Sequence, residues 1–181
     1  MDKQLARKST KPFYQYTEFT LGVIIVVLFL IASIFTKNFS TAYNISNLLK
    51  QGAITGVLAV AQTLVIITGG IDISCGSIAG FSCMVLAIMQ RDGSDFWLSL
   101  LVALGIGLVC GIANGAIIYD LKVPAMIATL GTQTIIRGIV KIISNALTVN
   151  GLDPRTTALG VSKVGPVPTL AVIWIVIAVI A

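Results

Sequence analysis

Residues 62–78 read QTLVIITGGIDISCGSI, and this stretch decides the fold more than any other part of the chain. It begins as an apolar, helix-like run, is broken by Gly69 and Gly70, offers one carboxylate at Asp72 and resumes at Ser74. A glycine-broken segment with a single acid is costly in a bilayer unless protein or a water-filled path surrounds it. The stretch therefore predicts a broken helix inside a bundle of membrane helices.

The composition points to a membrane protein. Of the 181 residues, 56% are hydrophobic and 10% are charged, and the mean hydropathy is +0.99. Soluble domains are usually only roughly 45–50% apolar. The net charge is +5, and four of the twelve cations lie near the start of the chain, at Lys3, Arg7, Lys8 and Lys11. A basic start of this kind predicts a cytoplasmic N-terminal anchor, and not a surface that binds nucleic acid.

The reactive side chains argue against an enzyme. The sequence has no histidine, which removes the commonest general base and the commonest metal ligand. Cys75, Cys83 and Cys110 lie in apolar segments and form no CxxC pair, so they predict neither a disulfide framework nor a metal site. Serine, aspartate and lysine occur, but without histidine or a paired-acid motif they assemble no catalytic site. We expect no catalytic residues, no cofactor and no metal.

Hydropathy divides the chain into a basic tail, residues 1–18, and a transmembrane domain, residues 19–181. The domain is predicted to be all-α and polytopic, with about six hydrophobic segments: 19–36, 48–68, 76–90, 96–119, 124 to about 146, and 167–181. A Ser/Asn cluster before residue 48 is expected to cap the second segment, and Pro124 to lie in the first turn of the fifth. Residues 150–165 are expected to form an extramembrane loop.

The two ends of the chain each allow a second interpretation. The first segment is longer than the apolar part of a secretory signal, and no A-x-A site follows it, so an anchor is favoured over a cleaved signal. The last run, residues 167–181, is shorter than the ~20 residues that span a bilayer and has no polar flank. We interpret the chain as the N-terminal part of a longer transmembrane domain, with a complete six-span protein as the alternative.

The orientation follows from the basic tail. With the tail inside, six crossings place the loops at 37–47, 91–95 and 147–165 outside. Residues 71–75 and 120–123 then lie on or toward the cytoplasmic side. If the break at 69–74 lies in mid-membrane, the segments around it make one crossing and every later segment is reversed.

Asp72 has two possible roles. As a structural residue it accepts backbone N–H bonds at the start of the next helix, with Ser74 and Ser77 as further caps. As a functional residue it is an acid in the transport path that binds a polar solute or a proton. The structural role is favoured.

The fifth segment carries a polar stripe on one helical face. Thr129, Gln133, Arg137 and Lys141 recur every four residues, which places them on that face. Arg137 and Lys141 either extend toward the headgroups, the favoured interpretation, or line a cavity with Gln133, or contact a partner.

Small residues predict where helices approach one another. Gly107, Gly111 and Gly115 form a GxxxGxxxG repeat, and such residues allow close backbone packing in lipid. The alternative is that glycine is simply frequent in membrane helices.

Two stretches together resemble a known family. Ala61-Gln62-Thr63, followed by IITGGIDIS at 66–74 and Gly76-Ser77, is similar to the signature of sugar-type ABC importer permeases, such as those for ribose, xylose and galactose. VPAMIATLG at 123–131, followed by Thr134 and Arg137-Gly138, resembles their second signature. The resemblance covers about residues 47–145. Cys75 departs from it, since a small aliphatic residue is usual there, and permeases of this kind are nearly twice as long.

The resemblance implies a function and a set of partners. The chain would be the permease subunit of a binding-protein-dependent ABC importer in the bacterial inner membrane, as part of the branched-chain amino acid/monosaccharide permease superfamily. An extracytoplasmic sugar-binding protein would deliver a monosaccharide, a second permease subunit, identical or different, would complete the path within the lipid, and cytoplasmic ATPase subunits would supply energy. The sequence has no GxxxxGK[ST] phosphate loop, so ATP hydrolysis is expected to come from a partner. The candidate translocation-path or helix-break residues are Gln62, Thr63, Thr68, Gly69, Gly70, Asp72, Ser74, Thr129, Gln133 and Arg137.

A different class of transporter remains an alternative. In a secondary transporter or channel, a broken helix carrying Asp72 would bind an ion or a proton near the midplane.

Overall fold

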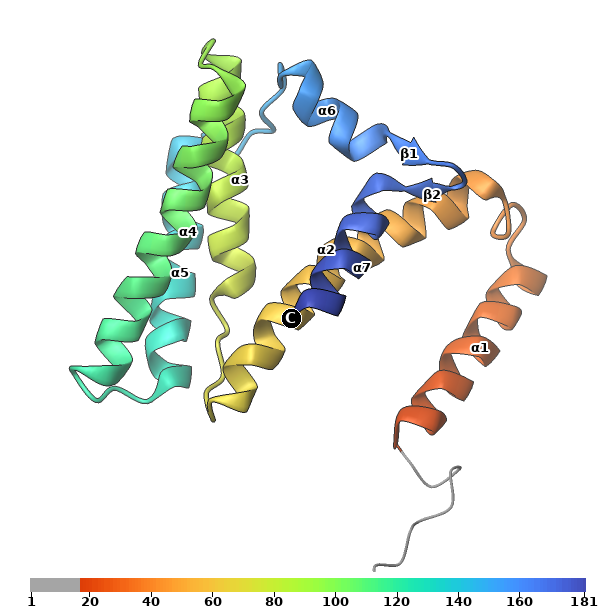
Figure 1. The fold of residues 1–181 in the computed structure, drawn as a ribbon, viewed down its shortest axis with the longest axis horizontal. Coiled ribbons are helices and arrows are strands. Elements are labelled where there is room, and N and C mark those ends of the chain that lie inside the picture. The colour runs from red at the N-terminus through yellow and green to blue at the C-terminus, as the bar shows by residue number, and fades with distance from the viewer. Residues whose placement is uncertain (1–16) are drawn as a thin grey trace, which may run out of the picture. The chain divides into compact units, whose positions relative to one another are not determined.

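The computed structural model describes residues 17–181, so most of the basic tail lies outside the described residues. The chain forms two compact units, Met1–Asn47 and Leu48–Ala181, which are described separately. Figure 1 shows the helical architecture, with α1 in the first unit and α3, α4 and α5 in the second. The predicted all-α membrane fold is confirmed.

The first unit contains helix α1, Thr17–Phe35, and the beginning of helix α2, Ala42–Ile67. Helix α2 begins six residues before the predicted start at residue 48, so the Ser/Asn cluster lies inside the helix and the expected cap there is wrong. Thr41 caps the helix instead, because its Oγ1 accepts the N–H of Asn44 at 3.3 Å. The same hydroxyl donates to the carbonyl oxygen of Asn38 at 2.8 Å.

The second unit contains the rest of α2 and the other elements. They are helices α3, Cys75–Arg91; α4, Phe96–Tyr119; α5, Ala125–Ile143; α6, Pro154–Val161; and α7, Thr169–Ile180; and strands β1, Lys163–Val164, and β2, Val167–Pro168. Within the described chain α2, α4 and α5 are long and apolar enough to cross a membrane, and 19–35, α3 and α7 are shorter apolar helices. The described chain thus has one apolar helix for each of the six predicted segments. Pro124 precedes α5 by one residue and does not lie in its first turn.

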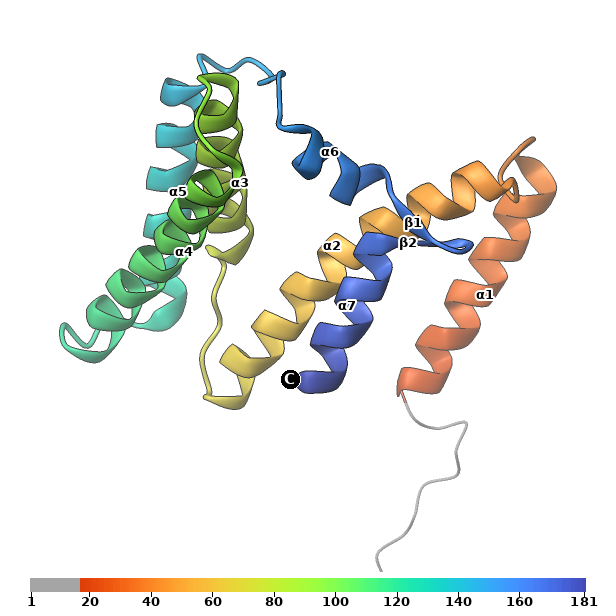
Figure 2. The ribbon, with the colours of Figure 1, turned by 45° about the horizontal axis from the view of Figure 1, so that its top comes forward.

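Helices α3, α4 and α5 pack side by side in each view (Figures 1 and 2). Most of the side chains buried on these helices and at their ends are small or polar, and include Ser74, Ser99, Ala103, Ala128 and Thr129. The large apolar side chains of α4 point outward instead, and Leu101, Leu104 and Leu108 each remain more than 60% exposed. This is the reverse of a soluble core, and it is the arrangement expected where lipid covers the outer faces.

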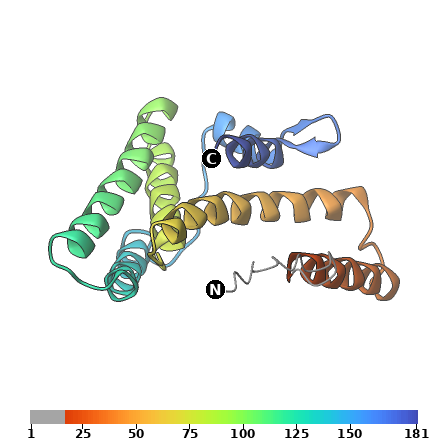
Figure 3. The same cartoon turned by 60° about the horizontal axis from the view of Figure 1, so that its bottom comes forward.

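The segment predicted as an extramembrane loop contains regular structure. Asp153 begins α6 by accepting the N–H of Arg155 at 2.7 Å, and Pro154 occupies the first turn. A two-residue antiparallel pair then joins Lys163 to Pro168 and Val164 to Val167, directly before α7 (Figure 3). The prediction of a loop over residues 150–165 missed these elements because they are short.

Gln90 connects the end of α3 to the start of α6. Its Oε1 accepts the N–H of Asp153 at 3.1 Å and the hydroxyl of Thr156 at 3.0 Å. The two contacts hold α6 against the end of α3 that leads into the α3–α4 loop.

Candidate functional site

The break after α2 is formed by a helix-ending motif. Gly69 has φ +81°, a left-handed conformation that glycine adopts without strain. The N–H of Gly70 donates to the carbonyl oxygen of Val65 at 3.2 Å, and that of Gly69 to Ile66 at 2.9 Å. This is the hydrogen-bond pattern of a Schellman motif, and it explains why the helix stops at these glycines.

Helix α5 holds the non-helical chain that follows. Thr129 is 1% exposed, and its hydroxyl accepts the N–H of Ile73 at 3.2 Å while donating to the carbonyl oxygen of Ala125 at 2.9 Å. Gln133 donates to the carbonyl oxygen of Ile73 at 3.3 Å and accepts from Nη2 of Arg137 at 3.1 Å, in the amide orientation that gives both its atoms a partner. Thr129 and Gln133, the first two residues of the predicted polar stripe, therefore bond the break directly, and the third, Arg137, bonds Gln133.

Helix α2 contacts the break through Gln62. Its amide donates to the backbone carbonyl oxygen of Asp72 at 2.9 Å and accepts the backbone N–H of Asp72 at 3.3 Å, again in the orientation that satisfies both atoms. A side-chain amide thus pairs with one backbone unit of the break, in place of the helical bonds that the break has lost.

A buried hydrogen-bond relay ends on the Asp72 carboxylate. The hydroxyl of Thr132 donates to Oδ1 of Asn114 at 2.6 Å, and Nδ2 of Asn114 donates to Oγ of Ser74 at 2.8 Å. The Ser74 hydroxyl then donates to Oδ1 of Asp72 at 2.6 Å, and its backbone N–H reaches the same oxygen at 2.7 Å. Each donor points toward the carboxylate, so the relay joins α5, α4 and the residue before α3 to the break.

These contacts correct the predicted capping arrangement. Asp72 accepts the N–H of Ser74 itself, the residue that precedes α3, so it closes a turn before the helix. Ser74 occupies the N-cap position but makes no side-chain cap bond, because its hydroxyl is given to Asp72. Ser77 donates to the carbonyl oxygen of Ser74 at 2.8 Å. The prediction that Ser74 and Ser77 cap α3 with their side chains is therefore wrong.

A cavity of about 570 Å³ lies beside the break. Its walls come from the end of α2, the break, the second half of α4 and the start of α5. Its lining includes Val65, Thr68, Gly69, Gly70, Ile71, Asp72, Gly111, Asn114, Gly115, Ile118, Val123 and Thr129. Two glycines of the predicted packing repeat thus face this cavity, and a Cβ at either would meet no atom within 4 Å. Gly107 differs, since a Cβ there would lie 3.9 Å from Oγ of Ser82 on α3.

The predicted site residues are only partly brought together. Most of them surround the break or line its cavity. Thr63 does not, because it is exposed and its hydroxyl donates to the carbonyl oxygen of Ala59 one turn earlier in α2. Lys141 lines a separate hollow with Cys83 and Ser144. The roles of all these residues in translocation or packing remain predictions.

Sequence reasoning missed Asn114 and Thr132. Asn114 is 6% exposed and is the only amide side chain in α4. A single amide in an otherwise apolar membrane helix normally faces the bundle interior, so this signal was available in the sequence. Thr132 directly precedes Gln133 of the polar stripe on α5 and carries no comparable signal.

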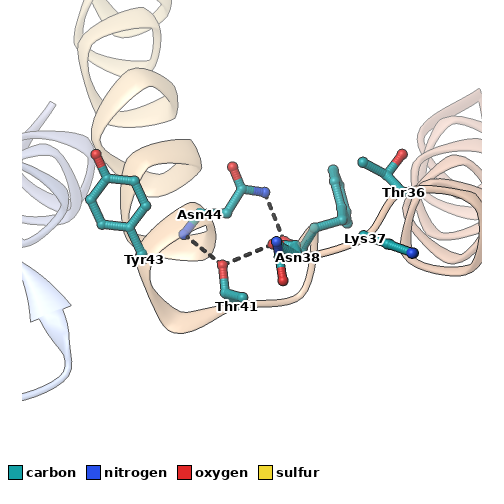
Figure 4. Close-up of a pocket in the computed structure, with 7 residues that line it drawn as sticks. Thr36, Lys37, Asn38, Thr41, Tyr43 and Asn44 are labelled. Atoms are coloured by element: carbon teal, nitrogen blue, oxygen red, sulfur yellow. Dashed lines mark hydrogen bonds between the residues drawn. The ribbon is translucent and has the colours of Figure 1, made fainter.

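A further hollow, of about 300 Å³, lies at the turn between α1 and α2 (Figure 4). Thr41 and Asn44 hold the turn together, since the Asn44 amide donates to the carbonyl oxygen of Phe39 at 2.7 Å. The Thr41 hydroxyl and the Asn44 amide are thus used within the turn itself.

Comparison with known proteins identifies the family. Residues 44–181 match the family model described as branched-chain amino acid transport system / permease component. The chain belongs to this permease family. The matched region includes the break, the relay and the whole of the cavity.

Several relatives of this permease are import proteins. The chain is 37% identical over 138 residues to a fructose import permease protein of Rhizobium meliloti, an alignment that covers 75% of this chain and 38% of the relative. It is 37% identical over 132 residues to a ribose import permease protein of Bacillus subtilis, covering 73% and 40%. It is 30% identical over 167 residues to an autoinducer 2 import system permease protein of Photorhabdus laumondii, covering 87% and 50%.

The chain spans half or less of the length of these relatives. No solved structure matches it significantly. Family membership and the apolar helices establish a multi-pass membrane protein that is a transport component.

Proposed function

We propose that this chain forms part of the translocation path of a binding-protein-dependent ABC importer for a monosaccharide. The match of residues 44–181 to the permease family carries the proposal. Ribose and fructose are the first sugars to test, because relatives named for their import are each 37% identical to this chain.

The energy source is proposed to be a partner protein. The sequence contains no GxxxxGK[ST] phosphate loop, so nucleotide hydrolysis would be supplied by cytoplasmic ATPase subunits. An extracytoplasmic binding protein would deliver the sugar, and a second permease subunit would face this one across the path. The N-terminus would be cytoplasmic and the membrane the bacterial inner membrane, in agreement with the basic tail.

The break is proposed as the part of the chain that contacts the path. Backbone that is not helical is tolerated at membrane depth only where protein or a water-filled cavity surrounds it. Residues 68–74 meet this condition, because Gln62, Thr129 and Gln133 satisfy part of their backbone and a cavity covers another part. The same feature would serve the alternative of a secondary transporter, but the relatives named for import systems support the importer.

Uptake into proteoliposomes tests the proposal. The protein is reconstituted with its ATPase and binding protein, and labelled ribose or fructose is supplied outside while ATP is enclosed on the ATPase side. We expect uptake only when ATP and the liganded binding protein are both present. Uptake that survives without ATP but disappears when the sodium or proton gradient is collapsed would replace the importer with the secondary transporter.

A further inference from the structure

One oxygen of the Asp72 carboxylate accepts no hydrogen bond from the described part of the chain. Oδ1 accepts both hydrogen bonds from Ser74, at 2.6 and 2.7 Å. Among residues 17–181 no group donates to Oδ2. A carboxylate can accept about four hydrogen bonds, so half of this capacity is open in a residue that lines the cavity.

The backbone of the break adds further free acceptors. Within the described chain, the carbonyl oxygens of Thr68, Gly69 and Gly70 accept no hydrogen bond. All three residues line the same cavity as Asp72. At membrane depth such carbonyls require a partner from water, protein or a bound molecule.

The polar side chains around the cavity offer few free donors. The hydroxyl of Thr129 already donates to the carbonyl oxygen of Ala125, and that of Thr68 donates to Val65 at 2.7 Å. Asn114 uses one of its two amide N–H groups for the Ser74 bond. Free acceptors therefore outnumber free side-chain donors on this wall, and a molecule that brings hydrogen-bond donors complements it.

The rest of the lining limits the size and character of that molecule. Val65, Ile71, Ile118 and Val123 give the cavity apolar walls beside its acceptors. Its volume of about 570 Å³ lies within the roughly 300–1,000 Å³ usual for small-molecule sites and is much larger than a bare ion needs. Hydroxyl groups on a compact neutral ring, with C–H faces between them, match both parts of the wall.

We propose that this cavity is a subsite for the transported sugar, in which Oδ2 of Asp72 and the carbonyl oxygens of the break accept hydrogen bonds from sugar hydroxyls. The inference rests on the proposed function and adds the contact atoms. Ser74 and Asn114 are positioning residues, because Ser74 holds Oδ1 and Asn114 holds the Ser74 hydroxyl. Oδ1 of Asp72 thus has the expected structural role, and Oδ2 has the proposed role of binding the sugar.

The test combines Asp72→Asn with sugar analogues that each lack one hydroxyl. Asparagine keeps an oxygen for Ser74 and replaces Oδ2 with an NH₂ donor, so the turn is preserved while the proposed acceptor is lost. Transport by the complete importer is measured in proteoliposomes with saturating liganded binding protein, for the parent sugar, ribose or fructose, and for each analogue. The affinity of the binding protein for each analogue is measured separately.

Removal of one key hydroxyl should slow transport by the wild-type protein roughly 10- to 100-fold, the range for a hydrogen bond to a charged acceptor. Asp72→Asn should slow the parent sugar by a similar factor, and the same analogue should then lose little more. Asp92→Asn is the matched control, because Asp92 lies on the α3–α4 loop with a side chain 55% exposed. It should leave all rates unchanged.

A second variant fills the cavity without touching Asp72. Gly115 lines the cavity and a Cβ there meets no atom within 4 Å, so the side chain of Gly115→Leu starts in open space and extends into the cavity. We expect about tenfold less uptake per assembled complex. Gly105→Leu is its control, because Gly105 lies on the same helix with equally open space and does not line this cavity.

Three results would overturn the subsite. They are wild-type transport rates in Asp72→Asn or Gly115→Leu, equal analogue losses in wild type and Asp72→Asn, and a dependence of uptake on a sodium or proton gradient that Asp72→Asn abolishes. The last would identify a cation site. Failure of the proposed function looks different, since wild-type protein would then show no uptake that requires ATP and binding protein.

Discussion

At the scale of single residues, the relay through Asn114 determines the geometry of the break. Asn114 uses both ends of its amide, one toward Thr132 and one toward Ser74. A buried polar atom that loses its partner costs about 1–3 kcal/mol, although hydrogen bonds measured in membrane helices are often at the low end. Loss of the Thr132 hydroxyl should therefore weaken the contacts of Asn114 on α4 as well as those within α5.

Thr132→Val tests the relay. Valine keeps the shape of threonine but leaves Oδ1 of Asn114 without its donor, so the free energy of unfolding should fall by about 1 kcal/mol. The measurement is the thermal midpoint of the purified protein in detergent. Thr134→Val is the control, because Thr134 is exposed and its hydroxyl donates to the carbonyl oxygen of Leu130 in its own helix. Equal midpoints for the two variants would show that the relay contributes nothing.

At the scale of elements, α2 and α7 approach each other at Gly56. A Cβ on this residue would overlap the indole ring of Trp174. Gly56 thus makes a real close contact, while the same test at Gly52, one turn earlier, meets open space. Only a glycine allows the indole to lie against the α2 backbone here.

Gly56→Leu should force the two helices apart and lower the thermal midpoint, whereas Gly52→Leu, one turn earlier, should not. The cost should be about 1–3 kcal/mol, the usual range for overpacking. Trp174→Ala in the Gly56→Leu background should recover part of the loss, because it removes the overlapping ring. If the double variant is as unstable as the sum of the two single ones, the contact is not the cause.

At the scale of the whole molecule, the contacts of Gln90 and the length of α4 show which loops lie at each end of the second unit. Gln90 joins the end of α3 to the start of α6, which places the α3–α4 loop and α6 at one end of the second unit. The α4–α5 turn lies at the other end of α4, a helix of 24 residues and so about 36 Å long. These ends should face opposite sides of the membrane.

Single cysteines test this arrangement in a background where Cys75, Cys83 and Cys110 are replaced by serine. Ser94→Cys and Thr157→Cys should react with an impermeant thiol reagent from the same side, and Leu121→Cys from the opposite side. The basic tail further predicts that the Leu121 side is cytoplasmic. Labelling of positions 94 and 157 from different sides would contradict the connection through Gln90.

Much of the fold could be predicted because it depends on neighbouring residues. The predicted limits of α4 are those observed, residues 96–119, and the break occurs at the glycines where it was expected. The start of α2 was placed too late because Thr41, a good cap, precedes a polar first turn that resembles a loop. The short elements at 154–168 were missed because they have too few residues to show a period.

The membrane class, the apolar segments and the position of the break follow from the amino-acid sequence alone, since run length, hydropathy and the Gly69-Gly70 pair are local properties. Only the tertiary structure decided that Asp72 bonds Ser74 through a single oxygen, and that Asn114 completes the relay. The physical reason is that the relay joins atoms from residues 40 positions apart, Ser74 and Asn114. Such a contact depends on how helices pack, which no single helix encodes.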